Sequence, residues 1–225
     1  MTTNTTAAPQ APAASAPVRP APRPRQAPPI AAPAPQPDPA SEAERRTFTL
    51  SGPIADTTGN LVTTITLSEP ELGHLMLAEH EKSGGEQAAA LISQLSGIPK
   101  AALRRLKLAD LKAFERWMRE LREIGGAVYE DDGAGGAVFT LSLPIPVEGG
   151  KAIAKLRLRT PDLDASIAVE KFKKQHEQTA AMIAALADLT IPVVRRLKIR
   201  DVAVIEAWLA PFVTESEAPA SPGAT

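Results

Sequence analysis

The sequence predicts an α+β fold made of two tandem copies of one small module, each a β-hairpin followed by about three α-helices. Three observations lead to this prediction: an internal repeat, alternating apolar residues at the start of each copy, and helical apolar spacing after them. FTLSGPI at residues 48–54 returns, 91 positions later, as FTLSLPI at residues 139–145. Without any gap, 25 of the 74 positions from 48 to 121 are identical to their counterparts.

The alternating residues at the start of each copy predict the hairpin. In the second copy, Phe139, Leu141 and Leu143 alternate with polar or small residues, and alternation resumes at residues 155–159 after a turn at residues 148–150. A period of two is typical of a half-buried strand. A lone hairpin is marginally stable in water, so the helices of the same module are expected to cover its apolar face.

Start signals for a first helix follow each hairpin directly. In the first copy, Ser68 is expected to be the N-cap and Pro70 the first helical residue, with a glutamate after them. Residues 160–162, Thr-Pro-Asp, repeat this pattern in the second copy. A second helix is expected near residues 86–96, and the glycine pair before it predicts the end of the first helix.

The final helix of each copy carries an apolar stripe with a tryptophan at the same repeat position, Trp117 and Trp208. This helix is expected to start near Asp110 in the first copy and Asp201 in the second, and both acids are interpreted as helix caps. Each tryptophan either anchors the core of its module or is a partly exposed anchor for a partner, since tryptophan is enriched at interface hot spots.

The repeat and the composition divide the chain into five segments. Residues 1–44 are a Pro/Ala-rich tail that is expected to be disordered, because it cannot bury enough apolar surface to offset its ordering entropy. Residues 45–124 are the first module, and residues 125–136 are a linker rich in glycine and acidic residues. Residues 137–213 are the second module, and residues 214–225 are expected to be a second disordered tail.

Composition argues against several classes of protein. A net charge of −1 is unlike the basic balance of a protein that binds nucleic acid by electrostatics. No apolar run reaches the roughly 18 residues that a membrane helix needs. There is no cysteine, and His74 and His80 lie six residues apart, so no metal site, cofactor site or catalytic group is expected, and the chain is not expected to be an enzyme.

The basic motif RRLK occurs in both copies, at residues 104–107 and 195–198. Its arginines are interpreted as solvated or structural, with contact to an acidic partner protein or to nucleic acid as the alternatives. The candidate partner-binding residues are therefore these arginines and the apolar stripe of the final helices: Arg104, Arg105, Arg195, Arg196, Phe114, Trp117, Leu121, Ile205, Trp208 and Phe212.

Phe-Thr-Leu-Ser-x-Pro-Ile, a turn and then Leu-x-Leu-Arg-x-Pro resembles the start of the tail assembly chaperones of contractile-tailed and Mu-like bacteriophages. The similarity is clearest over residues 139–164, and residues 91–99 and 106–110 fit later motifs of that family. The second copy lacks the glycine that the family has after the second helix. The duplication and the long Pro/Ala tail depart from the usual single module.

The resemblance implies a protein that binds the phage tape measure protein in the cytoplasm of the bacterial host and keeps it soluble during tail assembly. It implies no nucleic acid or membrane partner, and self-association is a further expectation. The alternative is a structural head–tail or tail protein that remains in the virion.

Overall fold

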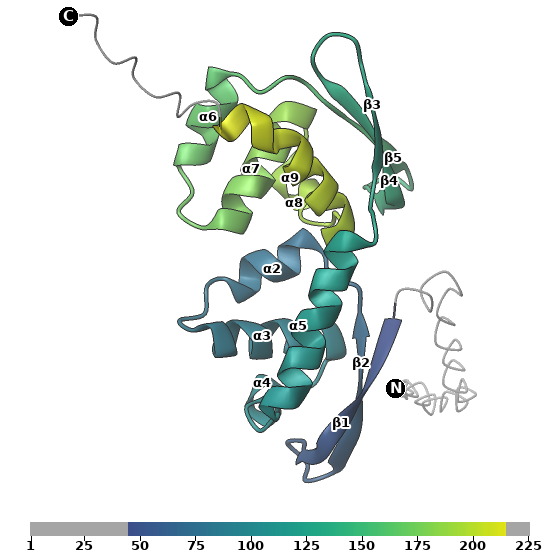
Figure 1. Ribbon diagram of the computed structural model, residues 1–225, viewed down its shortest axis with the longest axis vertical. Coiled ribbons are helices and arrows are strands. Elements are labelled where there is room, and N and C mark those ends of the chain that lie inside the picture. The colour runs from purple at the N-terminus through teal and green to yellow at the C-terminus, as the bar shows by residue number, and fades with distance from the viewer. Residues whose placement is uncertain (1–44, 215–225) are drawn as a thin grey trace, which may run out of the picture. The chain divides into compact units, whose positions relative to one another are not determined.

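Each module begins with a pair of antiparallel strands, as the alternation predicts. The computed structural model describes residues 45–214, so the tails expected at 1–44 and 214–225 lie outside it apart from Thr214. In the first module, helices α3 to α5 pack along the hairpin (Figure 1). Its elements are β1 (Arg45–Ala55), β2 (Leu61–Ser68), α2 (Leu72–Ala78), α3 (Gly84–Ser96), α4 (Lys100–Leu103) and α5 (Leu108–Glu123).

The second module repeats this order, and its last three helices begin and end 91 residues after α3, α4 and α5. The predicted α+β fold with two repeated modules is therefore confirmed. A short helix, α4 or α8, was not expected as a separate element and precedes each RRLK motif. The elements are β4 (Ala137–Pro146), β5 (Ala152–Leu158), α6 (Leu163–Glu170), α7 (Gln175–Ala187), α8 (Ile191–Val194) and α9 (Ile199–Thr214).

The segment interpreted as a linker contains a strand. β3 (Val128–Asp131) pairs antiparallel with β4, so the second module has a three-stranded sheet of order β3-β4-β5. Tyr129 of β3 stacks on Phe139 of β4, with ring centroids 5.3 Å apart. Before this strand, Gly126 passes so close to α9 that an added Cβ would lie 2.1 Å from the carbonyl oxygen of Arg200. Only glycine fits there.

The repeated FTLSxPI motif holds each hairpin to the last helix of its module. Ser51 donates from its backbone N–H and its hydroxyl to the carboxylate of Asp110, at 2.8 and 3.0 Å. Ser142 makes the same two hydrogen bonds to Asp201, at 3.1 and 2.9 Å. The pairing of both hairpins is irregular over this stretch, after Thr49 and after Thr140.

The interpretation of Asp110 and Asp201 as helix caps is therefore wrong. Both lie in the first turn of their helix, but their carboxylates face the hairpin, which presents two donors at the site. Asp201 is fully buried, and this burial raises the pKa of its carboxyl, against the hydrogen bonds from Ser142, which lower it.

The predicted N-caps Ser68 and Thr160 are also wrong, because both first helices start later. Ser68 ends strand β2, and α2 has Glu71 as its N-cap. Burial lowers the pKa of His74, so its neutral ring accepts a hydrogen bond from the Glu71 backbone N–H at 3.0 Å. In the second module, Asp162 is the N-cap and accepts from the N–H of Ala165 at 2.9 Å.

An aspartate takes the place of the glycine that the second copy lacks, and the backbone conformation at this position stays the same. Gly97 ends α3 in the left-handed conformation, with φ of 74°. Asp188 ends α7 in the same conformation, with φ of 54°. Aspartate is one of the few residues with a side chain that tolerate this conformation.

The pairs Ser51–Asp110 and Ser142–Asp201 make the same hydrogen bonds but differ in burial, so they allow a matched test of stability. We expect Asp201→Ala to lower the free energy of unfolding by about 1–3 kcal/mol, since two donors of Ser142 lose a buried acceptor. Asp110→Ala is expected to cost about 1 kcal/mol or less, because that site is more exposed. Denaturant unfolding of both variants measures this, and equal losses would contradict it.

Candidate partner-binding surface

Module 1 docks on module 2 through the segment that leads into α2. Both modules belong to one compact unit, and Glu71 and Lys198 form an antiparallel bridge between them. This places the start of α2 against the turn between α8 and α9. Three backbone hydrogen bonds surround the bridge: Leu72 N–H to the Leu197 carbonyl (2.9 Å), Gly73 N–H to the Arg195 carbonyl (2.8 Å), and Ile199 N–H to the Pro70 carbonyl (3.1 Å).

Two side chains of α2 belong to the apolar core of the other module. Leu72 and Met76, four residues apart on one helix face, are 0% and 7% exposed and pack in the cluster that contains Ile183, Leu197 and Ile199. The arrangement is a short helix in an apolar groove, a common mode of peptide recognition. We call the groove of each module between its last three helices the acceptor groove.

Charged groups surround this contact and orient it. Buried Glu69 pairs with Arg200, whose Nε donates at 2.7 Å, and Lys198 lies 3.4 Å from a carboxylate oxygen of Glu71. At the other end of α2, the carboxylate of Glu79 accepts from the backbone N–H groups of Gln175 and His176 at the start of α7. These two bonds measure 3.0 and 3.1 Å. The carboxylate thus caps a helix of the other module.

The pKa of Glu79 reflects two opposing effects. Burial raises the pKa of this carboxyl. Hydrogen bonds from the backbone and side chain of His176 and from Gln175 lower it by more than burial raises it, so the pKa is below its ordinary value. The ionised form of Glu79 is therefore the one that fits the contact between the modules.

The acceptor groove of module 1 has the same design, and none of the described residues fills it as α2 fills the groove of module 2. It encloses a hollow of about 290 Å³. At the repeat position of Ile199, which is 0% exposed in module 2, Leu108 is 75% exposed in module 1. The hollow is lined by Ser83, Gly85, Glu86, Ala89, Ile92, Leu103, Arg104, Leu106 and Leu111.

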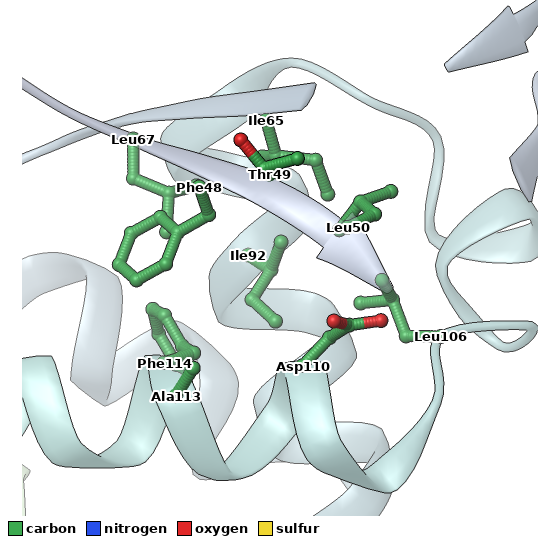
Figure 2. Close-up of a pocket in the computed structure, with 10 residues that line it drawn as sticks. All are labelled: Phe48, Thr49, Leu50, Ile65, Leu67, Ile92, Leu106, Asp110, Ala113 and Phe114. Atoms are coloured by element: carbon green, nitrogen blue, oxygen red, sulfur yellow. The ribbon is translucent and has the colours of Figure 1, made fainter. Parts of the chain in front are cut away.

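A second, smaller hollow of about 30 Å³ lies between the hairpin of module 1 and helices α3 and α5. Figure 2 shows Phe48 of β1 and Phe114 of α5 on one side of it and Leu50, Leu106 and Asp110 on the other. Ile92 and Leu106 line both hollows, so the apolar surface continues from one to the other. In module 2, the counterparts of Phe48 and Leu50 are buried.

The apolar residues predicted to bind a partner lie mostly in the cores. Phe114, Trp117 and Ile205 are buried, and the Trp117 ring contacts the rings of Phe48 and Phe114 at 5.6 and 5.9 Å. Leu121 and Trp208 are half-buried, and Phe212 is exposed and stacks on Trp208 at 5.2 Å. The structure thus brings Phe114 and Trp117 together as core, and Trp208 with Phe212 nearer the surface.

The four arginines predicted to bind a partner occupy different environments. Arg104 lines the open acceptor groove and pairs with Glu86 at 3.1 Å, and Arg105 is exposed. Arg195 offers its backbone carbonyl to α2, as described above. Arg196 donates to the carbonyl of Pro146 at 2.7 Å, which joins the turn to the end of β4.

The acceptor groove itself was missed in the sequence. The signal was present as an apolar pair at i and i+4, Leu72 and Met76 in one copy and Leu163 and Ile167 in the other. An apolar pair at this spacing is equally expected of a helix that packs within its own module, so the sequence alone does not indicate a contact between modules.

The described residues contain no arrangement suited to metal chemistry or to crossing a membrane. Over residues 45–214, no group of three or more His, Asp or Glu side chains is placed to hold a metal ion. None of the helices in this part of the chain has both the length and the apolar character that a membrane span requires. The described residues instead form apolar grooves with charged residues at their edges, a kind of surface that suits protein partners.

Comparison with known families agrees with the duplication of the module. The family model for phage tail assembly chaperone proteins, E, or 41 or 14, matches the chain twice, over residues 47–122 and 138–214. The two matches cover more than half of the chain, one in each module. The chain belongs to this family of phage tail assembly chaperones. Comparisons with curated proteins and with solved structures return no match.

The shifted pKa of Glu79 makes the stability of the chain depend on pH. Because the pKa is lower in the folded than in the unfolded state, the stabilisation is present above pH 4.5, the ordinary pKa of glutamate, and is lost as the pH falls through the folded-state pKa. We expect Glu79→Gln to reduce the slope of unfolding free energy against pH in this acidic range. Exposed Glu170, at the same repeat position, gives the control Glu170→Gln, and equal slopes in both variants would contradict the assignment.

The two tryptophans are expected to differ in stability. Trp117→Ala empties a buried site and should cost about 3–5 kcal/mol of unfolding free energy. Trp208→Ala removes a half-buried ring and should cost less. Denaturant unfolding followed by far-UV circular dichroism compares the two, and a larger loss for Trp208→Ala would contradict the placement of Trp117 in the core.

Proposed function

We propose that this chain binds the tape measure protein of its phage and keeps it soluble until the tail tube assembles around it. Membership of the tail assembly chaperone family supports this role. A tape measure chain is long and helical, and its apolar stripes would aggregate if left uncovered. A chaperone for such a chain needs a surface that recognises an apolar helix face rather than a folded shape.

The observation that carries the proposal is the open acceptor groove of module 1. Its counterpart in module 2 holds the helix α2 by two apolar side chains four residues apart, so the preferred ligand of this groove is defined within the chain itself. The tape measure segment is therefore proposed to be an amphipathic helix with large apolar residues at i and i+4. Acidic residues at the start of this helix would match Arg104 and Lys107 near the groove, as Glu71 matches Lys198.

The hollow beside the hairpin extends this surface. Phe48 and Leu50 are half-buried and lie next to Ile92 and Leu106, which both hollows share. A helix longer than α2 could therefore bury more apolar area on module 1 than α2 does on module 2. Phe114 lines this smaller hollow, and the buried Trp117 packs behind it in the core.

Co-expression with a candidate tape measure protein encoded near this chain tests the proposal. We expect that protein to be soluble and to co-purify only when this chain is present. Leu108→Asp should reduce co-purification by about tenfold or more, since it places a charge at the repeat position of Ile199, which is buried in the occupied groove of module 2. Leu61→Asp, which changes an equally exposed leucine of the hairpin, is the matched control and should have no effect.

Failure of the neighbouring protein to bind or to change solubility would overturn the tape measure proposal. Mass spectrometry of purified virions then examines the alternative of a structural protein. A chaperone should be missing from finished particles, and its presence there in stoichiometric amounts would favour the structural role.

A further inference from the structure

We propose that α6 of one copy docks in the acceptor groove of module 1 of a second copy, so that chains associate head to tail. This inference uses the same open groove as the proposed function, so α6 of a second copy and a tape measure helix would compete for it. Within one chain, the contact joins two different surfaces: α2 of module 1 is the donor helix, and module 2 supplies the acceptor groove. Since each module carries both surfaces, the chain has one further donor, α6, and one further acceptor groove, on module 1.

The unused donor presents the apolar pair that the used donor buries. Leu163 and Ile167 of α6 are 75% and 47% exposed, whereas Leu72 and Met76 at the same repeat positions are 0% and 7% exposed. α6 packs on α7 as α2 packs on α3, so the pair is displayed in the same way. Exposure of two large apolar side chains on one helix face is the condition for a docking surface.

The charged groups at the unused surfaces are also complementary. The pair of Glu71 and Lys198 corresponds to Asp162 and Lys107, which keep the signs of both charges. Glu170 stands at the position of Glu79. Inside the chain, Glu69 pairs with Arg200. At the unused surfaces, Thr160 of the donor stands at the position of Glu69 and Ala109 of the acceptor stands at the position of Arg200, so no charge would be buried without a partner.

One position differs in a way that affects the fit. A Cβ added to Gly73 would lie 3.1 Å from the Arg195 carbonyl oxygen, and the donor α6 has Asp164 at this place. The contact between chains must therefore open by a few tenths of an ångström at this point. The Asp164 carboxylate then stands next to Arg104, the counterpart of Arg195, which adds an attraction of opposite charges.

Head-to-tail contacts between two different surfaces either close into a ring or continue into a filament. A ring of two chains would place four modules in one cycle with every donor and acceptor used. A filament would leave one free donor and one free acceptor at its ends. Both forms depend on the same contact, and a substitution that removes either surface should abolish both.

A disulfide trap tests the register of the contact. The flanking hydrogen bonds make Glu71 and Lys198 a non-hydrogen-bonded antiparallel pair, whose Cα atoms lie about 4.5 Å apart, within the range of a disulfide. The chain has no native cysteine. We expect a mixture of the full-length variants Asp162→Cys and Lys107→Cys to form a disulfide-linked heterodimer on mild oxidation. The double variant Glu71→Cys/Lys198→Cys, which should close within one chain, is the positive control.

Complementation in solution tests the directionality. Sedimentation velocity should show association of the wild-type chain that grows with concentration. Leu163→Asp, which removes the donor, and Leu108→Asp, which removes the acceptor, should each be monomeric, yet their equimolar mixture should give a heterodimer through the one intact pair of surfaces. Both leucines are exposed, so neither change threatens the fold, and Leu61→Asp should associate like the wild type.

A wild-type chain that is monomeric at every concentration would overturn the proposal. So would variants that still associate alone, or a mixture that stays monomeric while the double-cysteine control closes. The tape measure assay is separable, because Leu163→Asp leaves the groove of module 1 intact. This variant should lose self-association and keep the tape measure protein soluble, and failure of the second result alone would count against the proposed function only.

Discussion

The insertion of Leu72 and Met76 into the core of the neighbouring module organises the folded chain. Because these side chains lie in the core of module 2 rather than in the core of their own module, module 1 completes the core of its neighbour. The backbone bridge at Glu71, the buried Glu69 with its Arg200 partner and the cap that Glu79 gives to α7 all surround this insertion.

The same insertion distinguishes the two grooves. Duplication supplies two acceptors and two donors, and a contact between adjacent modules uses one of each. What remains is an apolar groove on the first module and an apolar helix face on the second. The open groove, which is the surface proposed for the tape measure protein, is a repeat of one that the protein already uses internally.

Much of the fold was predictable from the sequence because its signals are local. The alternation around Phe139, the apolar spacing around Trp117 and the gapless repeat gave the strands, the final helices and the modular order. The N-caps at Ser68 and Thr160 were wrong because the backbone before each first helix makes other contacts that local propensity cannot anticipate. Asp110 and Asp201 were misread for the same reason, since their partners Ser51 and Ser142 lie 59 residues away.

The candidate surface was less accessible to sequence reasoning. An apolar residue at helical spacing reads the same whether it faces its own core, the neighbouring module or a partner, and Phe114, Trp117 and Ile205 proved to be core. Strand β3 was hidden among glycines and acids because its pairing with β4 depends on tertiary context rather than on an apolar pattern. Only the comparison of equivalent positions in the two modules, once their exposure is known, separates used from unused surfaces.

The disagreement between the two copies at Gly73 and Asp164 has a further consequence. Joining the modules in one polypeptide makes the internal contact intramolecular, so its occupancy is set by tethering and does not depend on how much protein the cell makes. The external surfaces have no such tether, and their occupancy varies with expression level. Substitutions at positions such as 164 can therefore set the threshold concentration of the external contact while the internal one stays closed. Fusion of the two modules in one chain thus makes the internal contact independent of protein concentration, whereas the external contact depends on it.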